Sequence, residues 1–201
     1  MVSYNLTSAA KNVYDSGLSL FSLKTLNDVL QIKKQSTSYS TIKRLVKSQI
    51  LQKIEKNKYL LVNSAVHDFA LANFLYEPSY ISFASALNLY GILSQFPYEI
   101  SSATSKKTKE KIFNGRSFTY THLKKELIWG YEKKDSFLIA VPEKALLDQL
   151  YLSAKGYKNI DLDEYDFSII RPKELKTYLK KYPQTAQFIA AKRKLQKYIK
   201  L

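Results

Sequence analysis

Residues 36–62 read STSYSTIKRLVKSQILQKIEKNKYLLV, and they contain the clearest structural signals of the first part of the chain. The first half of this stretch has apolar side chains at helical spacing, and Ser36 is placed to cap that helix. Two strand-like runs follow, at 50–54 and 59–62. The polar residues between them include Asn57, which tolerates the positive φ of a tight turn. The stretch therefore predicts a helix followed by a β-hairpin.

Two further helices are expected in front of this stretch. Apolar residues recur at helical spacing over 6–14, and Gly17 follows where such a helix would end. Ser22 is placed to cap a second helix with an apolar face over 23–30. Two short helices joined by a tight polar turn, then a basic hairpin, predict a winged helix-turn-helix domain over residues 1–64.

The third helix is expected to expose a polar and basic face. A helical wheel that buries Ile42, Leu45, Val46 and Gln49 leaves hydroxyl groups near the N-terminal end and cations further along. Hydroxyl groups reach base edges in a major groove, and cations hold the flanking phosphates. The candidate DNA-contacting residues, with those of the preceding turn and the hairpin tip, are Lys33, Lys34, Thr37, Ser40, Thr41, Lys43, Arg44, Lys47, Lys56, Asn57 and Lys58.

Two residues of this helix have particular expectations. Arg44 is the candidate for a bidentate contact with guanine. Tyr39 points between the two faces and is expected to pack beneath the helix. If five or six of the cations contact phosphate, the logarithm of the binding constant falls against log salt with a slope of roughly −5. The alternative is that these side chains form an ordinary solvated surface.

Residues 65–201 are expected to form a larger domain of mixed structure, so the fold class of the chain is α+β. Ser82 and Pro142 are placed to begin helices, and two more helices are expected over 172–182 and 184–201. Runs typical of strands occupy 98–104, 116–123, 127–131 and 137–141.

The composition favours some classes of protein and excludes others. The 201 residues contain no cysteine and only two histidines, so no disulfide, metal site or cofactor is expected. No run approaches 18 apolar residues and no signal-peptide pattern opens the chain, so a cytoplasmic protein without a membrane contact is expected. Thirty-two Lys and Arg oppose 17 Asp and Glu, and the net charge of +15 favours a polyanionic partner such as double-stranded DNA.

No catalytic constellation stands out, so we do not expect an enzyme. His67 and His122 are far apart in the sequence, and glycine-rich phosphate loops are absent. The Glu-Lys-Lys triplet at 132–134 resembles the end of a nuclease metal site, but a Lys-rich chain produces such triplets by chance. In the helix after Pro142, capping and solvent exposure are expected for Glu143, and a buried hydrogen-bonding role for Asp148.

Two more basic clusters lie outside the first domain. Each either extends DNA binding, meets an acidic protein surface, or is a solvated charged face. Their members are Lys106, Lys107, Lys109, Lys111 and Arg116 in the first cluster, and Lys192, Arg193, Lys194, Lys197 and Lys200 in the second.

Three separated segments carry a resemblance to a known family. They read YISFASAL at 80–87, SATSKKTK at 102–109 and AVPEKALLD at 140–148. In this order they resemble the AbiEi family, the transcriptional-regulator antitoxins of the AbiE abortive-infection system. The resemblance covers nearly the whole chain, because that family also begins with a winged helix that ends in a segment like the one at 58–61.

The resemblance implies two roles. The first domain would bind inverted repeats in its own promoter and repress its operon. The sequence itself has no clear dimerisation helix, so a monomer or weak dimer that binds DNA cooperatively is expected. The second domain would counteract a nucleotidyltransferase-like toxin, and whether the two proteins touch stays open. Two alternatives remain: a winged-helix repressor whose C-terminal domain senses a ligand or mediates assembly, and a nucleic-acid enzyme.

Overall fold

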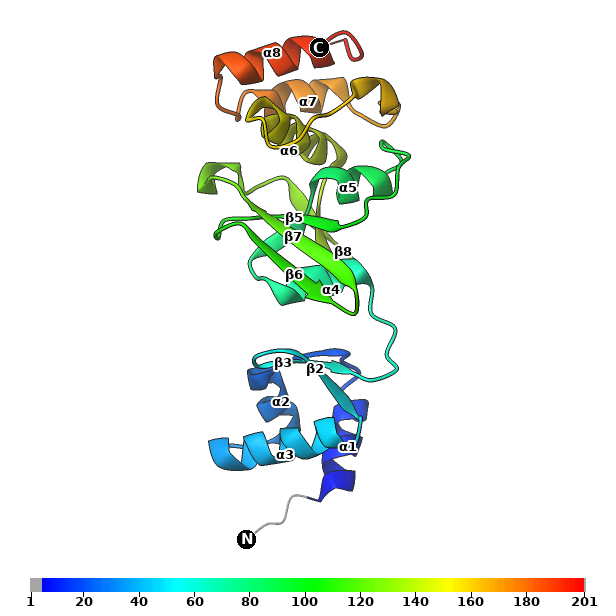
Figure 1. The fold of residues 1–201 in the computed structure, drawn as a ribbon, viewed down its shortest axis with the longest axis vertical. Coiled ribbons are helices and arrows are strands. Elements are labelled where there is room, and N and C mark those ends of the chain that lie inside the picture. Colours follow the sequence, from blue (N-terminus) through cyan, green and yellow to red (C-terminus); the bar gives the residue numbers. More distant parts are fainter. Residues whose placement is uncertain (1–4, 201) are drawn as a thin grey trace. The chain divides into compact units, whose positions relative to one another are not determined.

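The computed structural model describes residues 5–200, and within them the chain has a mixed α+β fold with eight α-helices and two β-sheets (Figure 1). The chain divides between His67 and Asp68 into two compact units. That division falls three residues after the boundary expected from the sequence. Each unit has its own sheet and its own buried core.

The first unit contains three helices and a three-stranded antiparallel sheet. The strand order is β1-β3-β2, so the hairpin of β2 and β3 gains a third strand, which the sequence did not suggest. The elements are α1 (Leu6–Asp15), β1 (Leu20–Ser22), α2 (Leu23–Leu30), α3 (Gln35–Lys47), β2 (Leu51–Glu55) and β3 (Lys58–Leu61).

Local signals explain where these helices begin and end. The Ser22 hydroxyl accepts a hydrogen bond from the Thr25 amide at 3.0 Å, which confirms the expected cap of α2. That helix ends at Gln31, whose φ of 54° is left-handed. Helix α3 begins two residues earlier than expected, because Lys34 occupies the N-cap position and Ser36 lies inside the helix. The three helices and the sheet bury one core, which includes Val13, Phe21, Leu26, Leu30, Leu45 and Leu51.

The second unit has a six-stranded mixed sheet of order β6-β7-β5-β4-β9-β8. The pairs β5–β7 and β4–β9 are parallel and the other pairs are antiparallel. The strands are β4 (Ser79–Ile81), β5 (Ile100–Thr104), β6 (Lys109–Phe113), β7 (Arg116–His122), β8 (Tyr131–Lys134) and β9 (Phe137–Ala140). The helices are α4 (Asp68–Leu75), α5 (Phe83–Leu89), α6 (Pro142–Ala154), α7 (Pro172–Leu179) and α8 (Ala186–Leu195), with short 3-10 turns at Lys125–Leu127 and Leu162–Glu164.

Helices cover both faces of this sheet. Tyr120 donates its hydroxyl to the Ala72 carbonyl of α4 at 2.7 Å, and Tyr80 donates to Asp148 of α6 at 3.2 Å. Tyr120 pairs with Ser102 and Tyr80 with Ala103, and adjacent residues of a strand point to opposite faces. Helices α4 and α6 therefore lie on opposite sides of the sheet, and α7 and α8 pack onto α6 (Figure 1).

The structure corrects several sequence expectations here. The run at 127–131 is not a strand, because Leu127 ends a 3-10 turn and β8 starts only at Tyr131. Helix α4 was missed, since its sequence DFALANFL is apolar on most sides and has no helical alternation to detect. Ser82 does precede α5, but its hydroxyl donates to Asp148 at 2.8 Å instead of capping the helix.

Candidate nucleic-acid interface

Helix α3 exposes a continuous polar face. Its buried residues are Ser38, Thr41, Ile42 and Leu45, which follow helical spacing. The opposite side of the helix is therefore centred on Ser36, Ser40, Lys43 and Lys47, with Arg44 and Thr37 on one flank, and all of these except half-buried Thr37 are exposed. We call Ser36, Ser40, Lys43, Arg44 and Lys47 the exposed face of α3.

Three expectations for this helix were wrong. Thr41 is only 3% exposed and so cannot contact DNA in this conformation. Gln49 lies beyond the helix in a left-handed conformation and is exposed, not buried. Tyr39 is 44% exposed and does not pack beneath the helix. Ser38 and Thr41 belong to the buried side of α3, where Ser38 donates a hydrogen bond to Asn27 of α2, whereas Gln49 is excluded from that side because the helix ends at Lys47.

The cations of this face project into solvent. Lys43, Arg44 and Lys47 are exposed. Among residues 5–200, Lys43 and Lys47 have no hydrogen-bond or ion-pair partner, so both ammonium groups are available to an anion. Ser40 donates its hydroxyl to the Thr37 carbonyl at 2.9 Å and keeps its acceptor lone pairs for another donor.

Two further lysines lie at the N-terminal end of α3. Lys33 and Lys34 are exposed, and the first turn of the helix contains no acidic residue. The positive end of the helix dipole thus adds to two ammonium charges. The turn before α3 therefore has the positive charge expected of a phosphate contact.

The hairpin of β2 and β3 presents one lysine rather than two. Asn57 has a φ of 62°, as the turn requires, and its carbonyl accepts from the Leu23 amide at 2.9 Å, which ties the hairpin tip to α2. Lys56 is exposed, whereas Lys58 is half-buried and bonds Glu55 at 2.9 Å. The expectation that both lysines extend from the tip is therefore corrected, because the Lys58 charge is balanced within the hairpin.

In the second unit, the first basic cluster surrounds a tyrosine. The ammonium groups of Lys106, Lys109 and Lys111 lie 5.5, 5.8 and 5.5 Å from the centre of the Tyr76 ring. Lys111 also donates to the Leu75 carbonyl at 2.7 Å, and Lys106 donates to the Glu77 carbonyl. These cations satisfy carbonyl groups at and just after the C-terminal end of α4. We call Lys106, Lys109 and Lys111 the Tyr76 cluster.

The other two members of that expected cluster behave differently. The Lys107 side chain is exposed, and its carbonyl accepts a hydrogen bond from the Tyr76 hydroxyl at 3.1 Å. Arg116 lies 3.4 Å from Asp68, in an ion pair that partly balances its charge. The structure therefore brings three of the five cations together and gives most of them internal partners.

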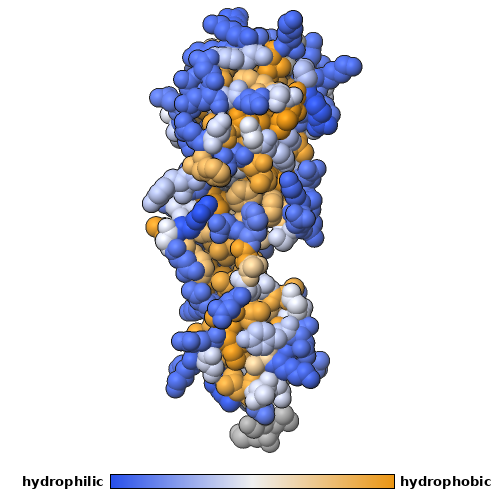
Figure 2. Space-filling view, turned by 90° about the vertical axis from the view of Figure 1, so that its right-hand side faces the viewer, coloured by the Kyte–Doolittle hydropathy of each residue, from blue (hydrophilic) through white to orange (hydrophobic). Residues whose placement is uncertain are grey.

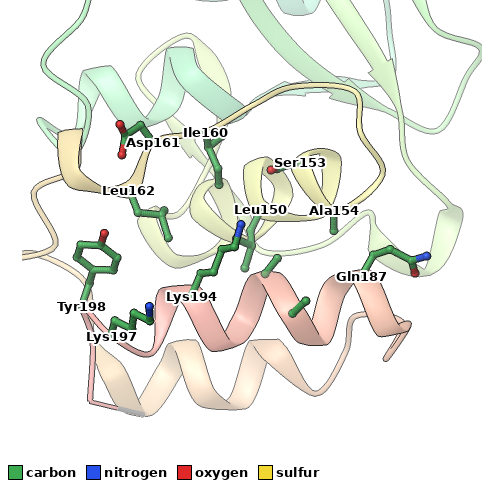
Figure 3. Close-up of a pocket in the computed structure, with 12 residues that line it drawn as sticks. Leu150, Ser153, Ala154, Ile160, Asp161, Leu162, Gln187, Lys194, Lys197 and Tyr198 are labelled. Atoms are coloured by element: carbon green, nitrogen blue, oxygen red, sulfur yellow. The ribbon is translucent and has the colours of Figure 1, made fainter.

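The second basic cluster divides between two sides of α8. Lys192 lines a hollow between α7 and α8, whereas Lys194 and Lys197 line a groove between α8, α6 and residues 160–162 (Figure 3). Arg193 and Lys200 are exposed, and neither lines these hollows. The expected single basic surface is thus divided by the geometry of the helix.

A buried polar cluster in the second unit was not foreseen beyond Asp148. Lys144 and Asp148 of α6 are both 0% exposed and form an ion pair. The carboxylate also accepts from Ser82 and Tyr182 at 2.8 Å and from Tyr80 at 3.2 Å. We call these five residues the buried polar cluster, which confirms the hydrogen-bonding role expected of Asp148.

Aromatic rings complete the surroundings of Lys144. Its ammonium lies 4.9 Å from the centre of the Trp129 ring and 5.2 Å from that of Tyr182. Burial lowers the pKa of Lys144, and the Asp148 carboxylate acts against that shift. A Cβ at Gly130 would lie 3.1 Å from Lys144 Cγ, and the φ of +68° there also requires glycine. The cluster fixes α6 against the sheet and is inaccessible to a ligand.

Glu143, the neighbour of Lys144, is also completely buried, so the expected solvent exposure was wrong. Its carboxylate accepts from the Arg171 amide and Nε at 3.0 Å and from an Arg171 terminal nitrogen at 3.2 Å. Burial raises the pKa of Glu143, but the hydrogen bonds from Arg171 outweigh it and the net shift is downward. Glu143 therefore joins the start of α6 to the start of α7.

The remaining candidate for chemistry, the Glu-Lys-Lys triplet at 132–134, lies on the exposed edge strand β8. Among residues 5–200, no three His, Asp or Glu side chains gather into a group that would hold a metal ion. None of the described helices is long and apolar enough to cross a membrane.

No protein-family model matches the chain, and a search of curated proteins gives no significant match.

Proposed function

We propose that the first unit is a winged helix-turn-helix that places α3 in the major groove of DNA. Three helices and a three-stranded antiparallel sheet, with a hairpin directly after the third helix, support this assignment. In this arrangement α3 is the recognition helix, and the β2–β3 hairpin is the wing that follows the neighbouring backbone.

The exposed face of α3 is the observation that carries the proposal. It has two hydroxyl groups, Ser36 and Ser40, in its N-terminal half and three cations in its C-terminal half. Short hydroxyl side chains suit base edges, and Lys or Arg suits guanine or phosphate. With Lys33, Lys34 and Lys56, six cations face outward, which gives a salt slope of roughly −5 at about 0.9 per phosphate.

We further propose that the whole chain is an autoregulatory antitoxin similar to the AbiEi family. The first unit would bind inverted repeats upstream of its own gene, with two copies binding cooperatively. The second unit would counteract a nucleotidyltransferase-like toxin encoded beside it. The sequence segments of the second unit support this role, and their residues form β4, α5 and the buried start of α6.

The first experiment measures binding of the full chain to labelled DNA from upstream of its gene, with excess random DNA and a salt series. Competitor-resistant complexes with a slope near −5 are expected. Complexes that vanish with competitor, or at about 0.2 M salt, would leave only non-specific attraction and overturn the operator-binding proposal.

Substitutions locate the contact on α3. Ser40→Ala/Arg44→Ala is expected to reduce the preference for operator over random DNA at least tenfold, because each good base contact provides about 1–3 kcal/mol. Lys11→Ala, on the exposed surface of α1, is the matched control and should keep that preference. Equal loss in both variants would remove α3 from the interface.

Rescue of toxin-expressing cells tests the second role separately. Arg44→Ala in the full chain should lose operator discrimination and still rescue growth, because the two roles are assigned to different units. A folded Arg44→Ala protein that fails to rescue would contradict this division of labour.

One observation favours a second candidate, a winged-helix repressor whose second unit senses a ligand. The groove between α6 and α8 has a volume of about 560 Å³, within the range of small-molecule sites.

A further inference from the structure

The groove beside α8 has an apolar floor. Helix α6 contributes to one wall, α8 forms another, and the segment after α6 closes one side (Figure 3). Figure 2 shows hydrophobic surface at the helical end of the second unit, bordered by hydrophilic side chains. The apolar residues that line the groove are Leu150, Ala154, Ile160, Leu162, Ala190 and Ala191.

Small side chains keep this groove open. Ala190 and Ala191 are consecutive on α8, and Ala154 lies across from them at the end of α6. A larger side chain at any of these positions would fill the space between the two helices. The groove therefore exists because α6 and α8 have small side chains where they face each other.

Charge is concentrated at one end of the groove. Lys194 and Lys197 line it there, and Figure 3 shows the Lys194 ammonium pointing from α8 toward Leu150. Among residues 5–200, neither lysine has a hydrogen-bond or ion-pair partner. The acidic residue of the lining, Asp161, accepts a hydrogen bond from the Asp163 amide at 3.1 Å. The other end, at Ser153 and Gln187, is polar and uncharged.

We propose that this groove binds a small amphipathic carboxylate, with the carboxylate at Lys194 and Lys197 and the apolar chain along α8. The distance from Lys194 to Gln187 along the helix is about 10 Å at 1.5 Å per residue, roughly the length of an eight-carbon chain. An apolar floor that ends at two unpaired cations fits a single-headed anion. A nucleic acid would need phosphate contacts along the whole length of the groove.

The test measures displacement of 1-anilinonaphthalene-8-sulfonate, itself an amphipathic anion, from the full chain by octanoate. Octanoate should compete better than octanol, and octylammonium should not compete, because the lysines repel it. Hexanoate should bind more weakly by about fourfold per methylene removed, as a buried chain requires. Equal competition by octanoate and octanol would overturn the proposal.

Variants locate the site. Lys194→Gln/Lys197→Gln should weaken octanoate at least tenfold and leave octanol unchanged. The matched control is Lys192→Gln/Lys200→Gln, which removes the same charge outside the groove and should change octanoate less than twofold. Ala190→Trp, at an exposed position, fills the groove and should weaken octanoate and octanol alike.

The same variants separate a free carboxylate from an anionic surface. Any binding of the protein to vesicles of phosphatidylglycerol and phosphatidylcholine should be the same for the wild-type protein and for Ala190→Trp. If Ala190→Trp leaves octanoate binding intact, or if the two lysines affect only vesicles or duplex DNA, the groove is not a carboxylate site. These readings do not require operator binding, so they stand apart from the DNA-binding and antitoxin proposals, and they deepen only the second candidate, which assigns the same groove to a ligand.

Discussion

The lysines of α3 and Lys144 of α6 have opposite surroundings. Lys43 and Lys47 are exposed and have no partner within residues 5–200, whereas Lys144 is 0% exposed and bonds Asp148 inside an aromatic enclosure. The Tyr76 cluster lies between these extremes, since its cations are mostly exposed but contact a ring and backbone carbonyls. The same kind of side chain thus serves as a surface cation on α3 and as an internal connector in α6.

The difference shows that net charge overstates the surface available to a polyanion. A charge that has an internal partner contributes little to binding, and its removal weakens the fold. A charge without a partner contributes to binding, and its removal leaves the fold nearly unchanged. Substitutions that remove equal charge from the two regions should therefore affect different properties of the protein.

The largest effect is expected for Asp148→Ala. The substitution leaves a buried ammonium and three buried hydroxyl groups without their acceptor, so the free energy of unfolding should fall by about 4 kcal/mol or more. Trp129 is the single tryptophan and lies beside Lys144, so its fluorescence in urea reports on the second unit.

Two variants sharpen this result. Lys144→Met should cost less than Asp148→Ala, because three hydroxyl groups still donate to the Asp148 carboxylate. Lys133→Met, on the exposed strand β8, should change stability by about 0.5 kcal/mol or less. A Lys144→Met protein less stable than Asp148→Ala would show that the ammonium, not the carboxylate, is the centre of the cluster.

Glu143→Gln tests the second internal connection and its pH dependence. The amide has one acceptor oxygen for the Arg171 donors, so the free energy of unfolding at pH 7 should fall by about 2 kcal/mol. The folded pKa of Glu143 lies below its ordinary value of 4.5, so the stabilisation is fully present above that pH and is lost as pH falls through the folded pKa. Urea titrations at several pH values should show the wild-type and variant curves converging in acid.

Curves that stay parallel down to pH 3 would contradict this sign. They would mean that the Glu143 carboxylate has the same pKa in the folded and unfolded chains. Its contribution to the free energy of unfolding would then be steric.

Much of the fold was predictable because it depends on local signals. Ser22 caps α2, and Pro142 and Pro172 begin α6 and α7 at the position where proline is favoured. Four elements were not expected from the sequence, namely β1, β4, β6 and α4, and β1 and α4 show why. Strand β1 has three residues and is held by pairing with β3, and α4 is apolar on nearly all sides.

The sequence predicted that α3 has an exposed polar face, but it did not predict which polar residues of the helix are buried. The apolar pattern placed Ile42 and Leu45 inside, yet the burial of Ser38 and Thr41 depends on α2, which contributes Asn27. A hydroxyl that satisfies its hydrogen bonds inside a core resembles a surface hydroxyl in the sequence. The same reasoning explains why Glu143 was expected to be exposed, although it is buried against Arg171.

A smaller effect than on stability is expected when surface charge is removed. Lys43→Gln/Lys47→Gln should raise the dissociation constant for operator DNA about tenfold at 0.1 M salt and reduce the salt slope by about 2. Lys106→Gln/Lys109→Gln removes the same charge from the Tyr76 cluster and should change the constant less than about threefold. Equal losses would show that both units contact the same DNA.

The smallest effect is expected in the β2–β3 hairpin, where an unpaired cation can be compared with a cation in an ion pair. Lys56→Gln removes one unpaired cation and should reduce the salt slope by about 0.9. Glu55→Gln/Lys58→Gln removes an ion pair with no net charge, so the slope should stay within about 0.3 of wild type. Filter binding across a salt series measures both. If removing the pair lowers the slope as much as Lys56→Gln does, Lys58 leaves Glu55 to contact phosphate, and internal pairing no longer separates binding cations from structural ones.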